Sequence, residues 1–283
     1  MKLKLLSTAL FTTVALSACK STPEEDMSLP VGFEQQAQLL PLKRPVLTLT
    51  DEAWHQAIGP FQLTNMDLSG KSTEKVSTST GWQTTARGGL LFQLMFHDEV
   101  NLSGDVVNKF NTRAEQSFSF DIQAQGAAPV HAECQILVFG QGEETLDNGV
   151  NSYNWQTSEQ QLSYLGCKLT QDGQVSTLVV EDKAGTAPVY KLNQGSTALT
   201  VSPVQEAPEL AKYNSFFQGG EYGYLVGDGQ TTKAALQLSL DQSRLWVSKD
   251  LPANAQQWYV AALFSLQMYD WQNRQWPVSS ATH

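Results

Sequence analysis

Cationic residues and cysteines are scarce in this sequence. Its 283 residues include 18 Lys and Arg against 28 Asp and Glu, a net charge of −10, and only three cysteines. Nucleic acids and anionic lipid surfaces both attract basic patches, so a chain of this charge is poorly suited to either. The composition therefore argues against a nucleic-acid partner and against docking on acidic headgroups.

Complete catalytic motifs are also missing. Residues 70–72 read Gly-Lys-Ser, but a phosphate-binding loop requires a glycine where Asn65 stands. Residues 72–75 match the Ser-x-x-Lys of penicillin-binding enzymes without its companion motifs, and neither Gly-x-Ser-x-Gly nor His-Glu-x-x-His occurs. We therefore expect a non-enzymatic protein without a cofactor. The alternative is a hydrolase with dispersed catalytic residues, in which His97 and His131 are the candidate bases.

Two histidine-containing segments are candidates for a metal or acid/base site. Residues 97–99 read His-Asp-Glu, but adjacent residues on a strand point in opposite directions and do not converge. His131 and Glu133 share one strand face, opposite to Cys134. No ligand spacing typical of zinc or calcium accompanies them, so the sequence predicts solvated strand ends and no metal.

The N-terminus has the layout of an export signal. Lys2 and Lys4 precede an apolar stretch over 5–16, which is too short to span a bilayer. Residues 16–19 then read Leu-Ser-Ala-Cys. Small residues directly before a cysteine resemble the lipobox of bacterial lipoproteins.

This resemblance implies cleavage before Cys19 and attachment of acyl chains to it. Each buried methylene contributes about 0.8 kcal/mol, and two or more chains anchor a protein stably. In Gram-negative lipoproteins an Asp after the cysteine marks retention in the inner membrane, so Lys20 implies the outer membrane. The protein is therefore expected to be held to membrane lipid through Cys19, with its domain facing the periplasm.

Three segments follow from these patterns. Residues 1–18 form the signal, 19–44 a lipidated flexible tether, and 45–283 a β-rich domain. The tether is expected because residues 20–44 are polar, rich in proline and without a sustained period. A short helix or edge strand within 33–42 is the alternative.

Alternation of apolar and polar residues predicts a mainly β domain. It marks strands over 118–122, 130–139, 165–169, 174–180, 222–226, 234–240 and 244–247, and the apolar run 90–96 suits a central strand. Asp172-Gly173 is typical of a tight hairpin turn. We expect an antiparallel sandwich or open barrel.

The C-terminal part departs from this pattern. Residues 253–272 are rich in Ala, Gln, Leu and Met, which favour helix, and Pro252 suits a first turn. Residues 263–268 also alternate, which leaves a strand as the alternative. The fold expected is thus mainly β with a C-terminal helix; the alternative is α+β in two subdomains divided near 202–212.

Cys134 and Cys167 form an even pair in a protein expected in an oxidising compartment. Each shares its strand parity with apolar neighbours and so faces the core. The sequence predicts a structural disulfide worth about 3–4 kcal/mol. Two buried free thiols are the alternative.

Tryptophan is the main candidate for a contact surface. Trp246 and Trp258 lie in apolar stretches and are expected in the core, whereas Trp155, Trp271 and Trp276 have polar neighbours. Exposed aromatic rings anchor interfaces and stack on sugars. We therefore hypothesise a non-enzymatic accessory or scaffold that binds an envelope protein. The alternative is a glycan- or lipid-binding module, since an open barrel can hold one small ligand.

Overall fold

The computed structural model describes residues 27–43, 55–84, 104–146, 156–204, 222–239 and 242–273. The predicted signal and lipid-bearing Cys19 lie outside these residues, as do the predicted strand 90–96, residues 97–99, Trp155 and Trp276.

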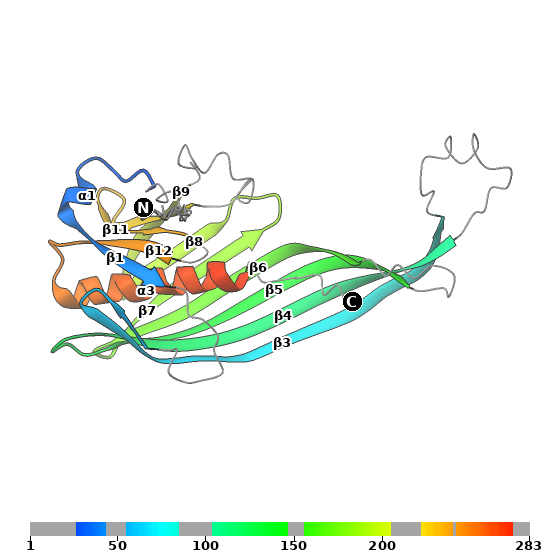
Figure 1. The fold of residues 1–283 in the computed structure, drawn as a ribbon, viewed down its shortest axis with the longest axis horizontal. Helices are drawn as coiled ribbons and strands as arrows, with labels where there is room; N and C mark the ends of the chain where they lie inside the picture. The colour runs from blue at the N-terminus through cyan, green and yellow to red at the C-terminus, as the bar shows by residue number, and fades with distance from the viewer. Residues whose placement is uncertain are drawn as a thin grey trace, which may run out of the picture.

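One antiparallel sheet of twelve strands forms the fold (Figure 1). Its order is β1-β12-β11-β10-β9-β8-β7-β6-β5-β4-β3-β2. The bounds are β1 Ala37–Lys43, β2 Gln56–Ile58, β3 Phe61–Thr84, β4 Gly104–Ala124, β5 Val130–Leu146, β6 Gln156–Gln171, β7 Gln174–Lys183, β8 Val189–Gln194, β9 Thr197–Val204, β10 Gly223–Gly227, β11 Thr232–Gln237 and β12 Gln242–Ser248. The end strands meet where the Gln56 side chain donates a hydrogen bond to the Lys43 carbonyl, 3.1 Å away. The sheet is thus nearly closed into a barrel, which confirms the open-barrel prediction.

Alternation along the strands divides the sheet into an inner and an outer face. In β4, Phe118, Phe120 and Ile122 face inward and are at most 2% exposed. The predicted β6–β7 hairpin is confirmed, and Asp172 and Gly173 both take the positive φ angles, 49° and 76°, that its tight turn requires. Short-range patterns therefore predicted these strands correctly.

Helix α3 (Ala253–Asn273) lies inside the barrel. Every residue from Gln257 to Tyr269 is buried, and the helix contacts β4, β5, β6, β11 and β12. A helix that is apolar on all sides belongs in an interior. This explains why 263–268 appeared to alternate, because Phe264, Leu266 and Met268 are all buried in a helix. In the described part of the chain, no helix has the length and apolarity needed to cross a bilayer.

The predicted tether over 19–44 is wrong for its second half. Helix α1 (Phe33–Gln36) leads into β1, which pairs with β12 along its whole length. Leu40 and Leu42 are fully buried, and Met27 is already packed at 2% exposure. The packed domain therefore begins by residue 27. It is also not divided near 202–212, because β9 pairs directly with β10.

Four strands continue beyond the barrel as a long, twisted arm (Figure 1). We define the arm as residues 75–84 of β3, 104–112 of β4, 140–146 of β5 and 156–161 of β6. Past residue 63, β3 pairs only with β4 among the described residues, so its other edge is open. Its pairing with β4 is interrupted by three register shifts, which twist an open edge and oppose edge-to-edge association.

Candidate functional site

The barrel interior is filled by side chains of α3. Phe264 contacts Phe120 edge to face, with ring centroids 4.8 Å apart, and Trp271 packs against Phe264. Trp271 is 1% exposed, and its indole nitrogen donates to the Ser239 carbonyl at 3.0 Å. It is thus a core residue, which corrects its expected place on a contact surface. Trp246 and Trp258 are buried, as predicted.

The predicted cysteine pair lies on the inner face. Cys134 of β5 is directly opposite Cys167 of β6, and their sulfur atoms are 2.07 Å apart, at bonding distance. Both residues are 5% exposed. The bridge joins neighbouring strands beneath α3.

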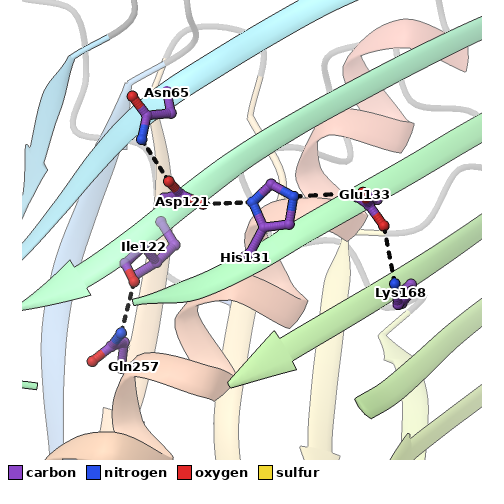
Figure 2. A network of polar contacts seen from close by, with 7 residues as sticks. All are labelled: Asn65, Asp121, Ile122, His131, Glu133, Lys168 and Gln257. Carbon is purple, nitrogen blue, oxygen red and sulfur yellow. Dashed lines mark hydrogen bonds and ion pairs between the residues drawn. The ribbon is translucent and has the colours of Figure 1, made fainter. Parts of the chain in front are cut away.

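A chain of polar contacts crosses the outer face of β3 to β6 (Figure 2). Asn65 donates to one oxygen of Asp121 at 2.6 Å, and the other oxygen lies 2.6 Å from His131 Nδ1. His131 Nε2 is 3.7 Å from Glu133, which pairs with Lys168 at 3.3 Å. Hence both ring nitrogens of His131 face carboxylates.

Among the described contacts of His131, this arrangement contains no nucleophile. A general base needs a nucleophile or substrate at its second nitrogen, and here that nitrogen faces Glu133. The described residues contain no group of three or more potential ligands placed to hold a metal ion. His131, Glu133 and Lys168 are each about half exposed, so these ion pairs contribute at most about 1 kcal/mol each. We interpret the network as a cross-strand ladder.

Among the described residues, ionisable groups with perturbed pKa values do not gather in a cleft. Backbone hydrogen bonds from Thr231 and Gln230 lower the pKa of the exposed Asp228 carboxyl to about 2. Burial raises the pKa of Asp182 and that of Tyr259, and the charge of Asp228 adds to the second shift. Perturbed pKa values mark catalytic sites when they converge. Asp228 belongs to a turn and Asp182 to a strand end, so their positions indicate structural roles.

Four partly exposed apolar side chains form what we call the outer strip. They occupy the outer face where the barrel meets the arm: Leu137, Phe139, Leu162 and Tyr164. Leu137 lies opposite Tyr164, and Phe139 lies opposite Leu162, on adjacent strands β5 and β6. Elsewhere on this face β5 presents polar side chains such as Glu133. The outer strip therefore interrupts the row of polar side chains on the outer face of β5.

Charged residues border the outer strip on both sides. Arg113 of β4 pairs with Phe139, and Lys183 of β7 pairs with Leu162. One step along the strands, Glu115 lies opposite Leu137 and Glu181 opposite Tyr164. Arg113 and Glu115 also contact each other at 3.3 Å. An apolar centre with a charged rim is the usual anatomy of a protein interface.

A cleft of about 560 Å³ lies next to the outer strip, at the base of the arm. Its walls carry the side-chain amides of Asn111, Gln141 and Gln161. Lys109 and Glu143 pair across it at 2.9 Å, so the cleft has no net charge from this pair. The remaining lining residues are Thr78, Phe110 and Gly142. This is a polar, neutral cleft and not a site for an acyl chain.

Comparison with protein-family models, curated proteins and solved structures gave no match. The site therefore rests on the geometry of this chain alone. Sequence reasoning missed the outer strip, although Leu137 and Phe139 stand at odd positions of β5 where the alternation predicts polar residues. That local irregularity was the available signal.

Proposed function

We propose that this protein is a non-enzymatic accessory or scaffold lipoprotein of the bacterial outer membrane. Acyl chains on Cys19 hold it there, and the domain faces the periplasm and binds another envelope protein. One observation carries the proposal: α3 fills the barrel, as the full burial of Leu263 and Phe264 indicates, so the surfaces left for recognition are outside.

The arm supports this proposal because it is ordered surface that the barrel core does not require. Holding one residue in a fixed backbone conformation costs about 1–2 kcal/mol. Residues 75–78 of the arm leave their side chains exposed, and Val76 is 52% exposed. Because residues 75–78 bury little apolar surface, the hydrophobic effect offsets little of this entropy cost. A surface of this kind is available to a protein partner.

A positional cross-linking experiment tests the proposal. A photo-activated cross-linking amino acid is placed at Val76 in the arm and, as the matched control, at Val175. Val175 is similarly exposed, at 46%, but lies beside the β6–β7 turn at the opposite end of the barrel. In living cells, we expect one reproducible protein adduct from position 76 and none from position 175. Equal adducts from both positions, or none from either, would contradict the proposal.

A glycan-binding module is the second candidate, favoured by the cleft at the arm base. Amide groups donate and accept hydrogen bonds at once, which suits the neighbouring hydroxyls of a sugar. Among described residues, the side chains of Asn111, Gln141 and Gln161 have no hydrogen-bond partner. The filled interior argues against the lipid version of this candidate.

Calorimetric titration with neutral cell-wall oligosaccharides tests the second candidate. Asn111→Ala combined with Gln141→Ala should abolish any binding heat. Gln123→Ala is the control, because Gln123 is an exposed amide at the other end of the same strand β4. Absence of heat from the unaltered protein, or equal loss in the control, would exclude this cleft as a sugar site.

A further inference from the structure

The outer strip belongs to two consecutive rungs of the sheet, each crossing four strands. The first rung reads Arg113, Phe139, Leu162, Lys183 from β4 to β7. The second reads Glu115, Leu137, Tyr164, Glu181. Each rung has two apolar residues between two charged ones. The first has cations at both ends, and the second has carboxylates at both ends.

We propose that the outer strip binds a second copy of this chain, face to face, about a two-fold axis that runs between the two rungs and parallel to them. Rotation about this axis places the first rung of one copy opposite the second rung of the other. Each strand then lies opposite the same strand of the other copy. Arg113 then faces the other copy's residue 115, a glutamate, and Lys183 faces the other copy's Glu181. Each contact occurs twice, because a two-fold interface uses the same patch on both subunits.

The apolar centre is complementary under the same operation. Phe139 faces Leu137 of the other copy, and Leu162 faces Tyr164. Each of these two contacts pairs an aromatic ring with a leucine side chain. Such a pair fills the space between the sheets better than two aromatic rings or two leucines would. Inner faces of packed sheets lie about 10 Å apart, a separation that side chains of this size span.

The charge order also argues against a two-fold axis parallel to the strands. A two-fold axis parallel to the strands would place Arg113 opposite Lys183, and Glu115 opposite Glu181. Like charges opposed across an interface cost several kcal/mol. Of these two axes, only the one parallel to the rungs gives four attractive contacts. This geometry closes on itself and gives a dimer and not a fibre.

Charge-swap variants test this proposal on the full mature chain. The acid variant carries Arg113→Glu and Lys183→Glu, and the base variant carries Glu115→Lys and Glu181→Lys. Neither can form a matched homodimer, but a mixture of the two restores all four contacts. The mature chain, with 16 basic and 28 acidic residues after loss of the two signal lysines, has a charge of −12. The variants have −12 − 4 = −16 and −12 + 4 = −8, so overall charge opposes their association.

Sedimentation velocity over a concentration series provides the measurement. We expect the unaltered protein to dimerise, each variant alone to bind itself at least about tenfold more weakly, and the mixture to recover the dimer. Lys168→Glu, a charge reversal on the same face but off the strip, should leave dimerisation unchanged. Circular dichroism confirms that each variant is folded.

Two results would overturn the proposal. One is an unaltered protein that remains monomeric at every concentration, and the other is a mixture that associates no better than its separate components. Neither result affects the cross-linking test of an envelope partner, because that test reads the arm. The two proposals can therefore fail independently.

Discussion

Gln257 of α3 donates a hydrogen bond from its side-chain amide to the backbone carbonyl of Ile122 in β4, 2.7 Å away. The same nitrogen is 2.8 Å from the Ala128 carbonyl. These contacts fasten the first part of the enclosed helix to the turn between β4 and β5. The Gln257 side chain thus helps to fix the position of α3 along the barrel.

Replacing Gln257 with leucine should lower the free energy of unfolding by about 1–3 kcal/mol, because the buried carbonyl of Ile122 and the part-buried carbonyl of Ala128 lose their donor. Urea denaturation measures this loss. Gln171→Ala is the matched control, since Gln171 donates to the Asn254 carbonyl from an exposed position; its effect should stay within about 0.5 kcal/mol. Similar losses in both variants would contradict the anchoring role.

Phe264→Ala should be more costly than the loss of Gln257. Phe264 is fully buried between Phe120 and Trp271, and removing an enclosed ring leaves a cavity. We expect a loss of about 3–5 kcal/mol in urea. Val175→Ala, on the exposed face, should change stability by no more than about 0.5 kcal/mol. A loss below about 1 kcal/mol for Phe264→Ala would argue against an enclosed helix.

Replacing both Cys134 and Cys167 with alanine should lower stability by about 3–4 kcal/mol, because the bridge closes a sequence separation of 33 residues in the unfolded chain. Urea midpoints of the double variant and of the unaltered protein give the difference. Reductant should destabilise the unaltered protein and leave the double variant unchanged. Equal responses to reductant would show that the bridge does not form in solution.

Local patterns predicted much of the sheet. The turn at Asp172-Gly173 and the alternation in β4 act between neighbouring residues, so they can be read from short segments. The pattern over 33–42 allowed the first strand only as the alternative to a flexible tether. Leu40 of β1 pairs with Leu245 of β12, and Pro41 lowers the strand signal although an edge strand tolerates proline. Only closure of the whole sheet places β1.

The candidate site was predictable only in part. Polar neighbours suggested that Trp271 is exposed, but its burial depends on the Ser239 carbonyl, which lies 32 residues away. Leu137 and Tyr164 each break an alternation, yet that they form one strip follows only from the β5–β6 register. Adjacency across strands is information that a linear sequence does not contain.

Cys19→Ser should release the protein from membranes, because the lipobox resemblance makes the Cys19 thiol the attachment point for acyl chains. Alkaline extraction of envelopes, followed by intact mass measurement, gives both the location and the acyl mass. The double alanine variant at Cys134 and Cys167 is the control and should remain with the membrane. Retention of Cys19→Ser after extraction would contradict the anchor.

Asp228 should make the β10–β11 turn sensitive to acid. Its carboxylate accepts hydrogen bonds from the backbone nitrogens of Thr231 and Gln230 at 2.8 and 2.9 Å, and these bonds lower its pKa from the ordinary 3.8 to about 2. A lowered pKa in the folded state means that the stabilisation is complete above the unfolded pKa and is lost as pH falls through the folded pKa. Amide hydrogen exchange of residues 228–232 should therefore accelerate between pH 4 and pH 2, after correction for intrinsic rates. Asp228→Asn cannot titrate, so its corrected exchange should be independent of pH over this range. The same acceleration in that variant would assign the acid response to another group.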